Sequence, residues 1–218
     1  MKRRVALGAS LALLAVGLSA CGAEDSSGKT QGVVRPTVTA SVPAEGSAEH
    51  APVAVSKIFD PDPFVTGIVE GTITTISYRY FDETTPMTDM TVRVQKSRGS
   101  LTSTIQVWEN GGLIPVTELS TSDQHRMLSR KNLPANAVVD FTAPHPGTRA
   151  KVGDHVLLVL RAVEGGVTYG GYNIVDDALG RFTRNAQGEF VRAGLMDGEP
   201  AGSAHERLSS SAVAAGLG

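Results

Sequence analysis

The chain has 218 residues, with 20 Lys or Arg against 22 Asp or Glu, so its formal net charge is −2. Nucleic-acid binding needs a basic surface that releases counterions, and neither this charge nor an aromatic fraction of 5% favours it. The single cysteine, Cys21, excludes an internal disulfide framework, so we expect a hydrophobic core alone to stabilise the fold.

The first predicted element is an export signal. Residues 1–4 read Met-Lys-Arg-Arg, an apolar run covers residues 5–18, and small residues follow before Cys21. A basic head, an apolar stretch of about 7–15 residues and small residues before a cut are typical of a signal peptide. A membrane-spanning helix would need about 20 apolar residues. The pattern therefore predicts a signal peptide over residues 1–20.

The Leu-Ser-Ala-Cys sequence at residues 18–21 resembles the lipobox of bacterial lipoproteins. The resemblance implies a diacylglyceryl group on the Cys21 sulfur, cleavage before Cys21 and acylation of the new amino terminus. Two or more acyl chains hold a protein at a membrane, whereas one is marginal. The resemblance thus implies a lipid-anchored protein on the extracytoplasmic face of the cell membrane, in the periplasm or at the cell surface. Without residues 1–20 the chain has 17 basic and 22 acidic residues, so its net charge is −5.

Two flanking segments lack periodicity. Residues 21–52 contain the cysteine and then mostly Gly, Ser, Ala, Thr, Pro and Glu, a composition that cannot bury enough apolar surface to fold. We expect them to form a flexible tether, with the folded domain over residues 53–200. Residues 201–218 are again small and polar and predict a flexible C-terminal tail, with a frayed helix over residues 204–215 as the alternative.

The first half of the domain alternates apolar and polar residues, as half-buried strands do. Strands are predicted over residues 68–80, 90–95 and 105–107. Ile73 is out of phase with the apolar residues after it, which predicts a bulge near residues 74–75. A turn is expected at residues 110–112, and Pro115 places the next short strand, residues 113–116, at a sheet edge.

The second half begins with the one predicted helix, over residues 120–132, capped by Ser120, Thr121 or Ser122. After it, short apolar stretches between glycine, proline and asparagine turns predict further strands. The continuous apolar run over residues 156–160 is expected to be the most buried of them. These strands cover residues 138–142, 156–160, 167–172, 181–183 and 189–191.

Many short strands, one short helix and frequent glycine turns predict a mainly β fold, a small closed or partly open β-barrel. Two stretches resemble those of an OB-like five-stranded barrel. One is the long first strand, which has glycines early, at residues 67 and 71, and the other is the Gly-Asp-x-Val-Leu-Leu strand that starts at Gly153. The resemblance covers residues 64–192. An immunoglobulin-like β-sandwich, without its usual disulfide, is the alternative.

The candidate ligand-binding residues are Trp108, Gln106 and Arg93. If Ile105 and Val107 face the core, Gln106 and Trp108 face outward, and Arg93 faces outward on the neighbouring strand. The OB-like resemblance implies a ligand face on these middle strands, and a tryptophan among polar groups suits a sugar or a peptide. The alternative is that Trp108 closes the barrel. Tyr169 and Tyr172 form a weaker second patch.

Other chemistry-bearing residues give weaker signals. His145 and His155 could together hold a metal ion if the loop between them brought their side chains close to each other. The other histidines, His50, His125 and His205, are expected at the surface. The acids at residues 60–62 and 176–177 are expected to set turns. The glycines of residues 22–30 have five residues between them, not the four of a phosphate-binding loop.

No catalytic motif such as Gly-x-Ser-x-Gly is present, and no resident cofactor is expected. The leading expectation is a non-catalytic binding or interaction module of the cell envelope that takes a cell-wall glycan or an envelope protein, with no nucleic-acid partner. An envelope hydrolase with non-standard catalytic residues is one alternative. A carrier of a metal or small ligand, using His145 and His155, is the other.

Overall fold

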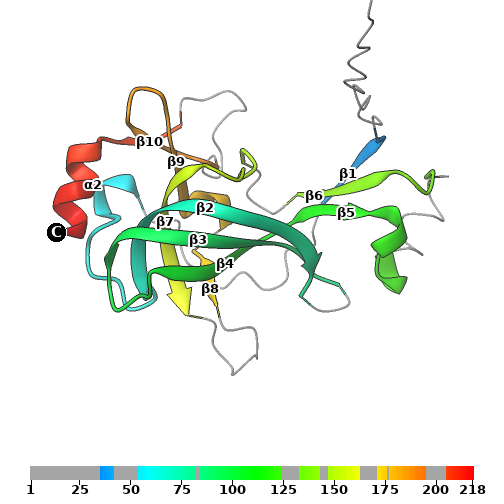
Figure 1. Ribbon diagram of the computed structural model, residues 1–218, viewed down its shortest axis with the longest axis horizontal. Helices are drawn as coiled ribbons and strands as arrows, with labels where there is room; N and C mark the ends of the chain where they lie inside the picture. The colour runs from blue at the N-terminus through cyan, green and yellow to red at the C-terminus, as the bar shows by residue number, and fades with distance from the viewer. Residues whose placement is uncertain are drawn as a thin grey trace, which may run out of the picture. The chain divides into compact units, whose positions relative to one another are not determined.

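The computed structural model describes residues 35–41, 54–81, 84–123, 133–142, 147–162, 171–175, 177–194 and 205–218 (Figure 1). The chain divides into two compact units, residues 1–34 and residues 35–218, and every described residue belongs to the second. The predicted signal peptide and Cys21 therefore lie outside the described residues, as do residues 22–30.

The described residues form two sheets. The smaller has the order β1-β6-β5, and the larger has the order β11-β10-β9-β7-β2-β3-β4-β8. The strands are β1 (Thr37–Ser41), β2 (Gly67–Tyr80), β3 (Pro86–Arg98), β4 (Thr104–Asn110), β5 (Gly112–Pro115), β6 (Val138–Thr142), β7 (His155–Ala162), β8 (Tyr172–Ile174), β9 (Arg181–Arg184), β10 (Phe190–Arg192) and β11 (Arg207–Leu208). The helices are the 3-10 turns η1 (Val55–Lys57), η2 (Val116–Glu118) and η3 (Asp177–Leu179), and the α-helix α2 (Ser210–Leu217).

Five strands of the larger sheet close into a ring. β2 pairs with β3, β3 with β4, β4 with β8, β8 with β7, and β7 again with β2. β8 pairs with β4 at only two positions and with β7 at three, so the ring is partly open at β8. The predicted mainly β fold with a partly open barrel is confirmed.

β2 is long because bulges let it bend around the barrel. Its register with β3 shifts between Ile73 and Thr75 and again between Glu70 and Gly71. The first shift confirms the predicted bulge. Gly71 is required at the second, since a Cβ there would lie 2.6 Å from the backbone oxygen of Arg93. The bulges allow β2 to pair with β7 over its first half and with β3 along its length.

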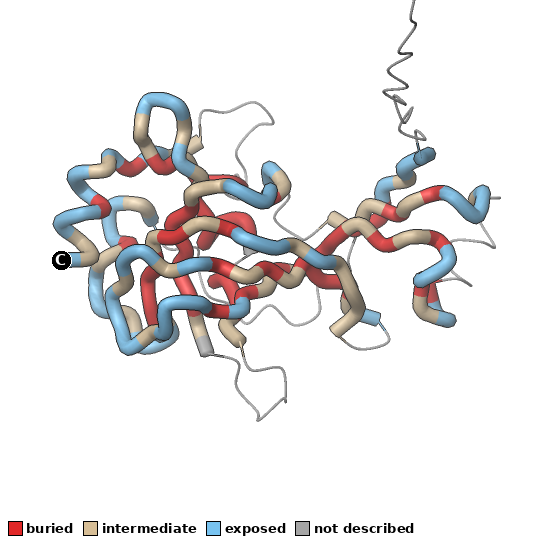
Figure 2. The backbone as a smooth tube through the Cα atoms, in the orientation of Figure 1, coloured by how far each residue is buried: buried red, intermediate tan, exposed pale blue. Residues whose placement is uncertain are grey.

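The barrel interior is mostly apolar, with Glu109 and Arg181 as buried charged residues, and burial is greatest in the strands of the ring (Figure 2). β7 supplies the most buried stretch, because its residues 156–160 are at most 2% exposed, as predicted. Its even-numbered side chains in this stretch face the interior, and its odd-numbered ones face the opposite side. The interior cluster consists of Val69, Ile73, Met90, Val92, Ile105, Val107, Ala150, Val156, Leu158, Leu160 and Ile174.

A second core covers the outer side of β7, and it corrects the prediction of a flexible C-terminal tail. Residues 205–218 contain β11 and α2, in which Leu208 and Val213 are buried. Apolar residues are few in this segment, but they meet apolar side chains of β7, β9 and β10, and Ile58 after η1, in one cluster. Ser209 caps α2 by accepting a hydrogen bond from the Ala212 N–H at 3.1 Å. No helix among the described residues is long and apolar enough to cross a membrane.

The smaller sheet corrects part of the predicted tether. β1 falls within residues 21–52, but all five of its residues pair in parallel with β6, and Ala40 is buried. The β-branched residues of β1 suit a strand, although the flanking composition obscures that signal. β5 lies at the edge of this sheet, as Pro115 predicted. The predicted helix begins at Thr121, and Ser120 Oγ accepts from the Asp123 N–H at 3.3 Å; residues 124–132 lie outside the described residues.

Candidate ligand-binding face

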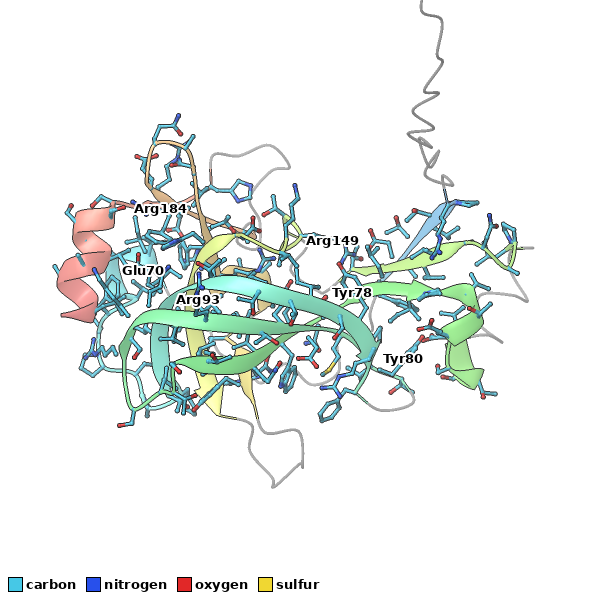
Figure 3. The ribbon with its side chains drawn as sticks, in the orientation of Figure 1. Glu70, Tyr78, Tyr80, Arg93, Arg149 and Arg184 are labelled. Atoms are coloured by element: carbon cyan, nitrogen blue, oxygen red, sulfur yellow. The ribbon has the colours of Figure 1, made fainter. Side chains whose placement is uncertain are left out.

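The outward side of β3 and β4 carries the three predicted ligand-binding residues. Ile105 and Val107 face the interior, so the residues between and after them face outward. Gln106 and Arg93 are exposed, and Trp108 is partly buried. Figure 3 labels Arg93 on β3. The alternation therefore places all three side chains on one face, which we call the outer face of β3–β4.

Hydroxyl and amide groups cross this face from strand to strand. Thr75, Thr91 and Gln106 are register partners on β2, β3 and β4. Thr75 Oγ1 donates to Thr91 Oγ1 at 2.7 Å, and Gln106 Nε2 donates to the same Thr91 oxygen at 3.0 Å. Both bonds lie at the surface, so the row presents neutral donors and acceptors to a ligand.

Trp108 is flanked by groups at the end of β2 and on β3. The ring of Phe81 stacks on the indole with centroids 5.6 Å apart and an angle of 26° between the planes. The Phe81 N–H donates to the Thr85 carbonyl at 2.8 Å, which fixes the chain where it leaves β2. Asp89, the register partner of Trp108 on β3, forms an ion pair with Arg79 at 2.9 Å. Trp108 thus has one aromatic and one charged neighbour.

A second polar row passes through Trp108. Asp89, Trp108, Asn173 and Arg161 are successive register partners on β3, β4, β8 and β7. Neighbouring strands lie about 4.8 Å apart, so each residue of the row borders the next. Asn173 and Arg161 are not among the residues predicted from the sequence, although the alternation at residues 172–174 is visible there. Tyr172, in the weaker predicted patch, instead packs against the barrel interior, and Tyr169 lies outside the described residues.

The chain enters β8 beside Gln106. At Gly171 a Cβ would lie 2.9 Å from the backbone oxygen of Gln106, so only glycine fits there without a shift. The outer face of β3–β4 is therefore bordered at one side by the end of β2 and at another by the start of β8.

Charges are also buried on the interior side of β4, opposite this face. Arg181 on β9 is 1% exposed, and its Nε and Nη2 donate to the two carboxylate oxygens of Glu109 at 2.9 and 3.2 Å. Arg181 Nη2 also donates to the Thr148 carbonyl at 2.6 Å. The buried guanidinium therefore has both a counter-charge and a neutral acceptor.

A second ion pair joins the loop before β7 to the smaller sheet. Arg149 donates to the Asp140 carboxylate on β6, and burial lowers the pKa of Arg149. Figure 3 labels Arg149 of this pair. This pair includes none of the three predicted ligand-binding residues, and we assign it a structural role.

The predicted histidine pair is only partly described. His145 lies outside the described residues. His155 lies on β7, where its Nε2 is 2.9 Å from Glu70 Oε1 and its ring packs near Phe190 with centroids 5.7 Å apart. His205 Nδ1 lies 2.7 Å from the Arg192 carbonyl, and His50 and His125 are outside the described residues. Among the described residues, no group of three or more His, Cys, Asp or Glu could hold a metal ion.

The acids at residues 60–62 line an open groove. Its volume is about 640 Å³, and Arg98 and Gly99 also line it. Asp62 Oδ1 accepts from the Phe64 N–H at 2.8 Å, so this carboxylate sets the turn before β2, as we expected of residues 60–62. Asp176 lies outside the described residues, and Asp177 begins η3.

The outer face of β3–β4 presents hydroxyl and amide groups at the surface, a guanidinium and a partly buried indole. No protein-family model matches the sequence, and comparisons with curated proteins and with solved structures found no match. The chemistry of this face is therefore the basis on which a function can be assigned.

Proposed function

We propose that the chain is a lipid-anchored, non-catalytic binding module of the bacterial cell envelope, and that its outer face of β3–β4 binds cell-wall glycan. The lipobox-like residues 18–21 support the anchor and the location outside the cytoplasm. The five-stranded ring supports the choice of face, since OB-like barrels bind oligosaccharides and other ligands on the middle strands.

One observation carries the proposed function: Trp108 lies on the same outward face as the polar row of Thr75, Thr91 and Gln106. Thr75, Thr91 and Gln106 present neutral hydrogen-bonding groups, and Gln106 is two residues away from the indole along β4. Sugar rings have an apolar face that packs on aromatic rings and hydroxyls that need donors and acceptors at their edges. The neutral groups of the row favour a glycan over a strongly charged partner.

Sedimentation with insoluble cell-wall glycan tests the proposal. The full chain carries Cys21→Ser, so that no lipid contributes to the pellet. We expect Gln106→Ala and Arg93→Ala each to weaken binding about tenfold, because each removes hydrogen bonds worth about 1 kcal/mol or more. Lys151→Ala is the matched control at an exposed position in the turn before β7. If both face variants sediment like the unsubstituted chain, the glycan does not bind this face.

A further inference from the structure

Two neighbouring side chains of the second polar row contain buried polar atoms that bond to no described residue. They are Trp108 Nε1, an obligatory donor, and Asn173 Oδ1, an acceptor. Asn173 is only 7% exposed. The two residues are register partners on adjacent strands, so the donor and the acceptor belong to the same site on the barrel.

A buried polar atom without a partner is costly, and native structures contain few of them. Each such atom has a physical cause, such as strain, a redox or catalytic role, or a water molecule or other group that binds there. Here the donor and the acceptor occur together, beside the face to which the proposed function assigns a ligand. One hydroxyl placed between the two atoms would satisfy both, because its oxygen can accept from Trp108 Nε1–H while its hydrogen is donated to Asn173 Oδ1.

We propose that Trp108 and Asn173 form a hydroxyl-binding pair that selects one sugar hydroxyl of the bound glycan. The inference rests on the proposed function, and it adds Asn173 as a specificity-determining residue. Phe81 stacks on the indole, so the aromatic surface of the site extends beyond Trp108. Arg161, the register partner of Asn173 on β7, adds donors at the end of the row.

The chemistry of the pair predicts discrimination against ligands that lack the hydroxyl. A site built to hydrogen-bond a hydroxyl rejects the analogue without it strongly, because its own buried groups then stay unpaired. A water molecule offers the same hydroxyl chemistry. The two sources differ in their consequences: a glycan hydroxyl contributes to affinity, whereas a permanently bound water contributes to stability of the free protein.

The test uses the full chain with Cys21→Ser and, as the probe, chitotriose, a trimer of N-acetylglucosamine. Trp108→Phe retains an aromatic ring without the N–H, and Asn173→Leu keeps the side-chain shape without the amide. Asn136→Leu makes the same change at an exposed position in the turn before β6. Binding is measured by titration calorimetry and stability by urea unfolding in the absence of the probe. The indole N–H of Trp108, the single tryptophan, gives one resolved NMR signal in the parent chain.

We expect Trp108→Phe and Asn173→Leu each to bind chitotriose about tenfold more weakly, which corresponds to the loss of one net hydrogen bond. Their urea unfolding midpoints should be no lower than that of the parent chain. Chitotriose should also shift the indole N–H signal of the parent chain saturably, and Asn136→Leu should bind normally. If the variants lose stability and keep full affinity, the pair binds water or bonds internally, and the inference is overturned while the proposed function stands. If the parent chain binds no chitotriose, both the inference and the glycan proposal fail.

Discussion

Glu109 and Arg181 form a two-pronged ion pair inside the barrel, although 72 residues separate them in the sequence. Arg181 is almost completely buried, so its charge is compensated by Glu109 and by the Thr148 carbonyl. The pair ties β9 to β4, which are not neighbours in the larger sheet. Its charges therefore link the extension of the sheet to the strand that carries Gln106 and Trp108.

Breaking this pair should destabilise the fold strongly. Glu109→Ala leaves the Arg181 guanidinium buried without its counter-charge, which costs about 3–5 kcal/mol in the free energy of unfolding. Arg207→Ala is the control, because Arg207 pairs with Glu189 at 2.9 Å at the surface, where a pair is worth less than about 1 kcal/mol. Urea unfolding of both variants checks the difference, and equal losses would contradict the assigned role of burial.

Replacing both charges should recover much of the loss. In a chain with Glu109→Leu and Arg181→Met, no buried charge of this pair remains unpaired, and such swaps are often neutral or stabilising. The expected unfolding midpoint therefore lies well above that of Glu109→Ala. A double variant as unstable as the single one would show that the pair's hydrogen bonds, rather than charge compensation, dominate.

The C-terminal helix should contribute to stability through Val213. This side chain is 0% exposed in the core on the outer side of β7. Val213→Ala removes about two methyl groups' worth of buried surface and should cost about 2 kcal/mol. Val152→Ala is the matched control, since Val152 is 61% exposed. This substitution should change the free energy of unfolding by no more than about 0.5 kcal/mol. Identical unfolding curves for Val213→Ala and the parent chain would contradict the packed helix.

Tyr80 should make stability fall at alkaline pH. Burial, followed by the hydrogen bond that its hydroxyl donates to Asp123 at 2.8 Å, raises the pKa of Tyr80 well above that of an ordinary tyrosine. Above about pH 10 the folded state still holds the proton that the unfolded state releases. The contribution of the protonated Tyr80 to the free energy of unfolding is therefore complete below about pH 10 and is lost as the pH rises further. Ultraviolet difference absorption should show one of the four tyrosines ionising last. Tyr80→Phe should remove that late step; if the step persists in the variant, the assignment is wrong.

Cys21 should carry the predicted lipid. Cys21→Ser should abolish incorporation of radiolabelled palmitate in a bacterial host that processes lipoproteins, and it should move the protein from the membrane to the soluble fraction. The physical reason is that acyl chains supply about 0.8 kcal/mol of membrane affinity per buried CH₂ group. Unchanged labelling of the variant would contradict the lipobox interpretation.

Local patterns predicted the elements that depend on neighbouring residues. The phase change at Ile73 predicted the bulge in β2, and the Ser-Thr-Ser run at residues 120–122 predicted a helix start, which the structure has at Thr121. The continuous apolar run of β7 predicted its burial. Alternation around Ile105 and Val107 also placed Gln106, Trp108 and Arg93 on the outward side, where the structure has them.

Non-local pairing decided what local patterns could not predict. β1 is a strand because β6, about a hundred residues later, provides its partner, and α2 is ordered because Val213 meets a core built by β7, β9 and β10. Asn173 joins Trp108 only through the register of β8 on β4. A sequence pattern shows which way a side chain faces, but the strand register decides which side chain lies beside it.

The most direct test of the glycan-binding face is NMR mapping of chitotriose on the isotope-labelled full chain with Cys21→Ser. We predict that the signals that move saturably belong to Thr91, Arg93, Gln106 and Trp108 on the outer face of β3–β4, with those of α2 and the groove at residues 60–62 unchanged. Shifts confined to another surface, or no saturable shift at millimolar chitotriose, would contradict the assignment of this face.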